Sequence, residues 1–344
     1  MKVKLSDIAK EMGISIAAVS MAINNKSGVS EETREQVLEV AERLGYKIKK
    51  TQPVQVSPLA KRFIKLLRIR KHGLVVMETA FFTALIDGIE MQCKKMGYEL
   101  LISNMVIDDL TTHTIADEYH DGVDGLVVLC TELDFADVEE LLNKKCPIVV
   151  LDRKFDYNVD TILMNNQKAC RQAVKFLVDM GHTEIGYLKS STSIYNFDSR
   201  FKSYRESIAK RGLPFDINHI MSLEPTIEGA YADMKESLLS FDPKLLPSAF
   251  IADNDIIALG AMNAMKEAGI RIPEDVSLIG IDDMPFCKFV SPQLSTIKVY
   301  KEEIGRHAVK MLVEQIDQET ECSKTVLVDT VVINRESVLD RKRP

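Results

Sequence analysis

The 344-residue sequence predicts a small all-α unit, a basic connector and a two-lobed α/β body with parallel sheets. Three observations lead to this fold class. The first 46 residues hold short apolar-periodic stretches that begin at hydroxyl side chains and stop at glycine, as capped helices do. Beyond residue 73, apolar stretches of strand length alternate with amphipathic stretches of helix length. This second part is too long for one sheet, so we expect two similar lobes that divide near residue 165.

The N-terminal unit is expected to hold three short helices. Ser6 and Ser15 are candidate caps of the first two, and Gly13 separates them. Ser30 starts the third helix, and Gly45 stops it. The side chains expected to face the core of this unit are Ile8, Ala9, Met12, Ala18, Val19, Ala22, Val37, Val40, Ala41 and Leu44.

The connector carries most of the positive charge of the chain. Residues 1–46 hold six basic and seven acidic side chains, whereas residues 47–71 hold nine basic side chains and no acid. Residues 72–344 have a net charge of −15. A basic arm on an acidic body predicts that only one end of the chain meets a polyanion. Within the connector, residues 58–67 are expected to form a short helix, since Pro58 is tolerated at a first helical position.

The expected elements of the body follow from its alternating pattern. Strands are expected at 74–77, 100–103, 125–129, 148–151, 161–164, 184–188, 220–223, 249–252 and 277–281. Helices are expected at 83–96, 168–180, 200–211, 256–268 and 302–316.

Several classes of protein find no support in the sequence. GxGxxG, HExxH, GxSxG and a complete phosphate loop are missing, so we expect no catalytic residues, no cofactor and no enzymatic activity. The histidines and cysteines lack metal-ligand spacing, so no metal site is expected. The six cysteines are expected to be buried small hydrophobes in a reducing cytoplasm. Neither a signal peptide nor an apolar run of membrane-spanning length is expected.

Residues 5–25 (LSDIAKEMGISIAAVSMAINN) are the main candidate for DNA recognition. Two short helices joined by a Gly-centred turn match a helix-turn-helix, whose second helix enters the major groove. Ala17 and Ala18 permit a close approach to the bases, and Ser15, Ser20 and Asn24 can donate to phosphates or bases. A small capped helical bundle without a DNA role explains the same spacing equally well.

This segment resembles the headpiece of the LacI/GalR family of bacterial transcription regulators. The resemblance continues through residues 24–34 (NNKSGVSEETR) and 44–46 (LGY). In the body it includes residues 181–188 (GHTEIGYL), 252–262 (ADNDIIALGAM) and 272–283 (IPEDVSLIGIDD). Several long matches in the same order make it specific. It implies a periplasmic-binding-protein-like body, in which an effector binds in the cleft between two lobes.

The family's hinge helix orders on the operator and inserts an apolar side chain into the minor groove. Residues 58–63 (PLAKRF) resemble it, which places Ala60 and Phe63 as the wedge and Lys61 near phosphates. The alternative is that Phe63 packs on the body beneath a flexible basic linker. The family usually has Leu in place of Phe63, and residues 47–57 lengthen the connector.

The expected DNA contacts include one departure from the family. Members often carry Arg where Met21 stands, and Met21 can only contact a thymine methyl or pack. The full set of expected operator contacts is Leu5, Ser6, Ser15, Ile16, Ala17, Ala18, Ser20, Met21, Asn24, Ser30, Thr33, Ala60, Lys61 and Phe63.

Polar side chains follow several expected strands, and ligands of open α/β sheets bind beyond the carboxyl ends of strands. Carboxylates accept from sugar hydroxyls, and a guanidinium donates to two oxygens at once. The expected effector contacts of this kind are Asp152, Arg153, Arg200, Asn254, Asp255 and Asp282. For Arg153 and Asp255 a helix cap or an ion pair between the lobes is the alternative; the other four match effector-contacting positions of the family.

An aromatic contact is also expected in the cleft. Phe81 and Phe82 follow the expected first strand, and an aromatic ring can stack on the apolar face of a sugar. We expect one of them in the core and Phe82 to face the ligand. The family usually has Asn-Pro before these two residues, where Thr79 and Ala80 stand here.

Together these features predict a sequence-specific DNA-binding transcriptional regulator in the cytoplasm, with repression as the expected action. Its headpiece is expected at residues 1–46, its connector at 47–72 and its effector-binding and dimerisation domain at 73–338. We expect a homodimer on a near-palindromic operator, controlled by a small molecule such as a sugar or sugar derivative. The alternative is a solute-binding protein, cytoplasmic or exported, without a DNA role; an exported one would need a signal peptide.

Overall fold

The computed structural model describes most of the chain, in two compact units formed by Met1–Ala60 and Lys61–Pro344. Each unit is described by itself. The described residues are 3–23, 29–44, 46, 62–76, 80–107, 115–120, 122–144, 146–240, 245–318 and 322–342. None of the helices in these ranges is both long and apolar enough to cross a membrane.

The first unit contains three helices around a small core. They are α1 (Leu5–Met12), α2 (Ile16–Ile23) and α3 (Glu31–Arg43). Gly13 takes a left-handed conformation at φ 68°, which lets the chain turn sharply between α1 and α2. The buried core consists of Ile8, Ala9, Val19, Ala22, Val37 and Ala41. These are core residues that the apolar spacing predicts.

The expected caps of α2 and α3 are confirmed. Ser15 Oγ accepts a hydrogen bond from the backbone N–H of Ala18 at 3.1 Å. Ser30 Oγ accepts one from the backbone N–H of Thr33 at 3.2 Å. Each hydroxyl satisfies a helix N–H that has no partner within the helix.

The cap expected for α1 is wrong. The helix begins at Leu5, so Ser6 lies inside its first turn and is exposed. Instead, the Asp7 carboxylate accepts from the backbone N–H of Lys4 at 2.8 Å. A carboxylate is favoured over a hydroxyl in this first turn, because its charge also complements the positive end of the helix dipole.

The first lobe of the body is built on a six-stranded sheet, counted over the described residues, in the order β11-β5-β4-β3-β1-β2. All of its neighbouring strands are parallel. The strands are β1 (Arg62–Arg70), β2 (Tyr98–Val106), β3 (Gly125–Leu129), β4 (Ile148–Leu151), β5 (Asp160–Met164) and β11 (Thr325–Val328). The helices of this lobe are α4 (Ala80–Lys95), α5 (Phe135–Leu142) and α10 (Lys301–Asp317), with a short 3₁₀ helix at Ile115–Glu118.

The second lobe repeats this design with the order β12-β10-β9-β8-β6-β7. Only the β10–β12 pair is antiparallel among the pairs of this sheet in the described part of the chain. The strands are β6 (Ile185–Ser190), β7 (Ile220–Leu223), β8 (Ala249–Ala252), β9 (Ser277–Asp282), β10 (Ser295–Lys298) and β12 (Val331–Ile333). The helices are α6 (Asn166–Asp179), α7 (Tyr195–Lys210), α8 (Ile227–Ser240) and α9 (Asp255–Glu267), with 3₁₀ turns at Ile217–His219 and Pro285–Lys288.

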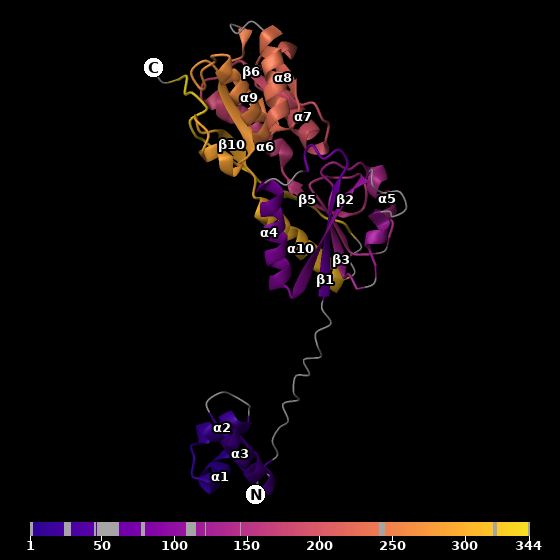
Figure 1. The fold of residues 1–344 in the computed structure, drawn as a ribbon, viewed down its shortest axis with the longest axis vertical. Helices are drawn as coiled ribbons and strands as arrows, with labels where there is room; N and C mark the ends of the chain where they lie inside the picture. The colour runs from indigo at the N-terminus through magenta and orange to yellow at the C-terminus, as the bar shows by residue number, and fades with distance from the viewer. Residues whose placement is uncertain are drawn as a thin grey trace. The chain divides into compact units, whose positions relative to one another are not determined.

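The chain passes between the two lobes three times, after β5, after β10 and after β11 (Figure 1). The first passage lies at residue 165, where the sequence predicts the division. The later passages return α10 to the first lobe and β12 to the second. The sequence pattern shows neither return, because they depend on which sheet each strand joins.

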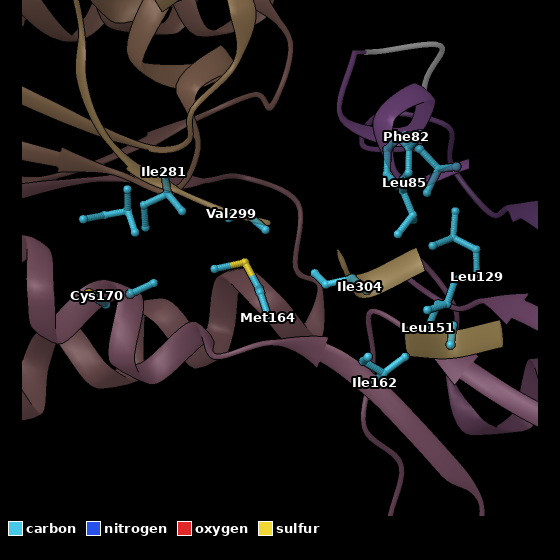
Figure 2. Close-up of a cluster of buried hydrophobic side chains, with 14 of the residues drawn as sticks. Phe82, Leu85, Leu129, Leu151, Ile162, Met164, Cys170, Ile281, Val299 and Ile304 are labelled. Carbon is cyan, nitrogen blue, oxygen red and sulfur yellow. The ribbon is translucent and has the colours of Figure 1, made fainter. Parts of the chain in front are cut away.

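One apolar cluster runs through both lobes along these passages. Figure 2 shows Phe82 of α4, Ile304 of α10, Val299 and Met164 at two of the passages, and Ile281 of β9. All five side chains are buried. Apolar side chains at the passages between the lobes therefore pack in the same core as side chains of both lobes.

The first strand differs from the sequence prediction. Residues 62–67, expected in a short helix, belong to β1, while residues 74–76, expected in a strand, form a bend. A central strand needs apolar side chains on both faces. Residues 62–70 provide them, with Ile64 and Leu66 on one face and Leu67 and Ile69 toward the other. The body thus begins eleven residues earlier than the expected residue 73.

Phe63 lies in this strand and not in a helix. It aligns with Glu99 of β2, and its backbone N–H donates to the Asp124 carboxylate at 2.7 Å. The described arrangement therefore corrects the prediction of a helix-borne wedge. Phe63 belongs to a strand of the body and is half-buried, whereas its packing beneath a flexible basic linker stays a prediction. The other expected hinge residues, Ala60 and Lys61, lie outside the described residues.

Carboxylates of the body pair with several basic residues that were assigned to the connector. Lys65 Nζ lies 2.6 Å from Glu118, with both side chains largely buried. Arg62 lies 3.4 Å from Asp317, and Lys71 pairs with two aspartates of the α5 turn. This part of the basic arm is therefore less available to phosphates than its charge alone suggests.

The cysteines only partly follow the expected burial. Four are buried, whereas Cys146 is half-buried and Cys322 is exposed. Burial raises the pKa of the Cys146 thiol to about 11, which leaves it as the neutral thiol near neutral pH.

Candidate functional site

A cavity lies between the two lobes, beyond the carboxyl ends of their parallel strands. Five of the predicted effector contacts line it, namely Phe82, Asp152, Arg200, Asn254 and Asp282. The remaining lining residues are Val75, Phe81, Thr131, Ile194, Asn196, Phe197, Ile256 and Met284. The cavity therefore combines aromatic and aliphatic walls with a few convergent polar groups, as small-molecule sites do.

Two carboxylates of the cavity sit on strained backbone. Asp152 directly follows β4 and has φ 66°, while Asp282 ends β9 and has φ 129°. Positive φ is costly for residues other than glycine and is concentrated at binding sites. Thr131 Oγ1 donates to Asp152 Oδ2 at 2.7 Å and orients that carboxylate.

Arg200 stands opposite Asp282 and is held by three other groups. Its Nε donates to Asn166 Oδ1 at 2.8 Å, and its Nη1 donates to the backbone carbonyl of Asp253. Among the described residues its Nη2 donates only to the thioether of Met164, at 3.0 Å, and stands 4.0 Å from Asp282 Oδ1. A thioether is a weak acceptor, so a ligand oxygen is a better partner for this N–H group.

Asp282 Oδ1 is a buried acceptor without a hydrogen-bond donor among the described residues. Burial raises the pKa of Asp282 to about 7; Arg200 opposes this rise, and the charge of Asp255 adds to it. Burial likewise raises the pKa of Asp152, against the hydrogen bond from Thr131 and the charge of Arg200. Both carboxylates lack solvation that ligand hydroxyls would restore.

The two phenylalanines follow the expected assignment only in part. Both line the cavity, but Phe82 is 4% exposed and belongs to the core, while Phe81 is only half-buried. Their rings meet edge-on, with centroids 5.2 Å apart. Lys301 Nζ lies 5.4 Å from the centroid of the Phe81 ring. Phe81 is therefore the more exposed of the two rings, while Phe82 lines the cavity as expected and is also buried in the core.

Arg153 and Asp255 do not line this cavity. Arg153 turns to Asp134, whose carboxylate lies 3.1 Å away, and to the Phe155 ring. Asp255 is fully buried and accepts from the Thr296 hydroxyl at 2.6 Å and from a backbone N–H at 2.8 Å. The alternatives of a helix cap or an ion pair between the lobes are not met either. Arg153 pairs with a residue of its own lobe, and the cap of α9 is Asn254 instead of Asp255.

Sequence reasoning missed the loop of residues 71–76, which brings Val75 to the cavity. The buried Glu132 carboxylate holds this loop by accepting five backbone hydrogen bonds of 2.7–3.2 Å. Burial by itself raises the pKa of Glu132, but these bonds outweigh it and leave the pKa below its usual value. The donors are the N–H groups of Lys71, His72, Gly73, Val75 and Val76.

Other polar residues of the cavity were also missed. Asn196 lies on the first turn of α7 and accepts from Asn166 Nδ2 at 2.7 Å, within the same network as Arg200. Thr131 follows β3 and orients Asp152. Their positions after expected strands could have pointed to them, since residues after neighbouring parallel strands converge.

The headpiece places most of the expected DNA contacts at or near its surface. Ile16, the first residue of α2, is 53% exposed, although large aliphatic side chains are usually buried. Ser6, Ser15 and Ser30 are exposed, and Leu5, Ala18, Ser20, Met21 and Thr33 are half-buried. Asn24 lies outside the described residues, as does the side chain of Ala17.

Comparison with known proteins assigns both units. Residues 4–48 match the family model "Bacterial regulatory proteins, lacI family", and residues 174–338 match "Periplasmic binding protein-like domain". The chain is 31% identical over 343 residues to the ribose operon repressor of Haemophilus influenzae, which covers 98% of this chain and 99% of that protein. The chain belongs to the LacI family.

A second relative and a solved structure agree with this assignment. The HTH-type transcriptional repressor PurR of Aliivibrio fischeri is 31% identical over 347 residues, covering 98% of each chain. The fold is similar to that of the transcriptional regulator CelR in its cellobiose complex, with a TM-score of 0.69 and 22% identity over 98% of this chain and 100% of that one.

As a LacI-family member, this protein is a DNA-binding transcriptional regulator with a small-molecule effector. The similarity extends over the full length and includes the headpiece. It therefore favours a regulator over the alternative of a solute-binding protein without a DNA role. The two relatives named above are repressors.

Proposed function

We propose that this LacI-family protein is a transcriptional repressor whose effector is a sugar or sugar derivative bound in the cavity between the lobes. The observation that carries the proposal is Asp282 Oδ1, a buried acceptor that has no donor among the described residues and belongs to a residue lining the cavity. A sugar hydroxyl would donate to it, and Arg200 Nη2 would exchange its thioether partner for a ligand oxygen. The names of the relatives, a ribose operon repressor and a regulator in complex with cellobiose, support this ligand class.

The four proposed polar contacts are Asp152, Arg200, Asn254 and Asp282. Phe81 adds a half-exposed ring that can cover the apolar face of a sugar. Burial of the two carboxylates makes the free site costly, so effector binding should stabilise the arrangement of the two lobes that forms the cavity. A nucleobase is the competing effector class, and PurR is among the relatives. If the effector test finds a nucleobase instead of a sugar, the nucleobase replaces the sugar in this proposal.

On the DNA side, the N-terminal end of α2 is the proposed reading surface. Ile16 would make apolar contact with base methyl groups, while Ser15 and Ala18 lie at the same helix end. We propose that a homodimer presents two headpieces to a near-palindromic operator, since one small headpiece buries too little surface for tight specific binding. Such a protein would act in the cytoplasm, where chromosomal DNA is.

The test is a titration of full-length protein on genomic DNA fragments, with and without a panel of sugars and nucleobases. A specific shift that a sugar alters, and that Asp282→Asn makes insensitive to the sugar, is the expected result. Specific binding altered only by a nucleobase would reject the sugar. A lack of specific binding at physiological salt would reject the repressor itself. Sedimentation of the free protein tests the homodimer.

A further inference from the structure

Lys301 connects two residues of the effector cavity that belong to different lobes. It is the first residue of α10, in the first lobe, and it follows the second passage between the lobes. Its ammonium group donates to the backbone carbonyls of Asp282 and Asp283 at the end of β9, in the second lobe. It also lies 5.4 Å from the centroid of the Phe81 ring, on α4 of the first lobe. Asp282 and Phe81 line the cavity, whereas Lys301 is not among the lining residues.

The position of Lys301 is by itself unfavourable for a lysine. The residue is only 9% exposed, and a buried ammonium group loses most of its hydration. It also lies in the first turn of α10, where the positive end of the helix dipole repels a cation. In Figure 2 this stretch of chain runs between Val299 at the passage and Ile304 of α10, both of which belong to the apolar cluster. The contacts with the second lobe and with the Phe81 ring offset these local costs, which is the pattern expected of a functional residue.

The turn that Lys301 holds has a strained backbone. Asp282 has φ 129° and Asp283 has φ 54°, in the region that favours glycine. Among the described residues, the other side chains that hydrogen-bond this turn come from the second lobe. Thr296 Oγ1 accepts from the Asp283 N–H at 3.3 Å, and Arg335 pairs with the Asp283 carboxylate. Lys301 is thus the side chain by which the first lobe holds this turn.

The charge of Lys301 also acts on the Asp282 carboxyl group. Burial raises the pKa of Asp282 to about 7, and the charges of Asp255 and Asp152 add to the rise. The positive charges of Arg200 and Lys301 oppose it. An ionised carboxylate is a stronger acceptor for a ligand hydroxyl than a neutral carboxyl group. Lys301 therefore increases the share of Asp282 that is ready to bind near neutral pH.

We propose that Lys301 is a positioning residue for effector binding, which holds Asp282 in place from the first lobe and so ties the affinity for the effector to the arrangement of the two lobes. This inference rests on the proposed function, because it takes Asp282 to be the acceptor for a sugar hydroxyl. If the lobes move apart, the end of β9 loses the ammonium group, and Asp282 loses both its support and the nearby charge. The lobe arrangement and the effector therefore stabilise each other by the same factor.

Isothermal titration of the full-length protein over a range of pH tests the proposal. The probe is whichever of D-ribose, D-glucose and cellobiose binds the wild type most tightly. Its affinity should rise as the pH passes through about 7, where Asp282 ionises, and then level off. Lys301→Met should weaken binding near neutral pH at least about fivefold and move the rise at least about half a pH unit higher, because the cation no longer favours the ionised carboxylate. Lys301→Arg should leave the rise where it is.

Lys310→Met removes an exposed lysine of the same helix and is the matched control. A wild-type affinity that does not rise with pH, or a rise that stays at the same pH in Lys301→Met, would overturn the proposal, even if the affinity falls. A purely structural role for Lys301 would weaken binding equally at every pH and leave the rise in place. In either case the proposed function stands, provided that a sugar binds and Asp282→Asn weakens that binding.

Calorimetry of the free protein gives a second measurement that needs no ligand. Since Asp282 destabilises the folded protein as it ionises, stability falls with pH up to the pKa of the folded state. In Lys301→Met this fall should continue to a higher pH than in the wild type. If no sugar binds but the fall is extended in this way, the proposed effector class fails and the link between Lys301 and Asp282 stands; without the extension the link fails as well. If Lys301→Met does not fold, Lys301→Gln, which keeps a donor without the charge, replaces it in both measurements.

Discussion

Asp282→Asn is expected to stabilise the free protein and to weaken effector binding. The Asp282 side chain is buried, its Oδ1 has no donor among the described residues, and burial raises its pKa to about 7. A carboxyl group whose pKa rises from about 4 in the unfolded chain to about 7 on folding destabilises the folded state when it is ionised. At 1.36 kcal/mol for each pKa unit, three units correspond to roughly 4 kcal/mol. Since Asp282 titrates together with its neighbours, we expect a gain on the order of 2–4 kcal/mol.

The pH dependence has a definite sign. Between about pH 4 and about pH 7 the folded protein holds a proton on Asp282 that the unfolded chain has lost, so stability decreases as the pH rises. Asp253, whose pKa burial raises to about 6, contributes in the same direction. Calorimetry of the free protein from about pH 5 to about pH 8 should therefore show a steeper loss of stability for the wild type than for Asp282→Asn.

Effector affinity should change in the opposite direction. The amide cannot replace a charge-assisted acceptor, so the loss is about 1.5–3 kcal/mol, roughly ten- to a hundredfold in Kd. Asp275→Asn is the control. Asp275 is exposed, and the hydrogen bonds from Arg271 lower the pKa of its carboxyl group to about 2. Removing this carboxylate should therefore reduce stability near neutral pH and leave effector binding unchanged. An Asp282→Asn protein that is no more stable than the wild type at about pH 8, or that binds effector equally well, would refute this reasoning.

Four other substitutions test separate parts of the structure. Glu132→Gln should increase hydrogen exchange at residues 71–76 and weaken effector binding, because the amide can no longer accept all five N–H groups; unchanged exchange would contradict this. Gly88→Ala should lower the free energy of unfolding by about 1–3 kcal/mol in denaturant titrations, since its Cβ would lie 2.2 Å from the Glu302 carbonyl oxygen. Ser15→Ala should cost the headpiece about 1 kcal/mol, seen as faster exchange at the start of α2. Phe63→Ala should destabilise the body by about 1–3 kcal/mol with operator affinity unchanged; the reverse result would restore the minor-groove wedge.

The headpiece and the effector-facing strand ends were largely predictable from local sequence. Ser15 and Ser30 cap helices because a hydroxyl there reaches an N–H group three residues on, which is a local relation. Asp152, Asn254 and Asp282 could be found because each follows a continuous apolar strand, and neighbouring parallel strands end at one edge.

The first strand could not be recognised in the same way. Residues 62–70 (RFIKLLRIR) mix basic and apolar side chains, with basic residues at 62, 65 and 68, and Pro58 lies shortly before them; this pattern also suits a short basic helix. Their position between β2 and β3, together with the burial of Lys65 beside Glu118, decides for a strand. Such ion pairs join residues far apart in the sequence, so no local window contains both partners.

The sequence by itself determined the charge distribution, the headpiece helices, most strands and the carboxylates at the strand ends, since all of these follow from short-range periodicity and spacing. Only the tertiary structure decided which acidic and aromatic groups face the cavity. It turned Arg153 toward Asp134, buried Asp255, and left Asp282 Oδ1 without a donor among the described residues. The orientation and hydrogen bonding of a polar group depend on every element packed around it, and in this body three passages between the lobes set that packing.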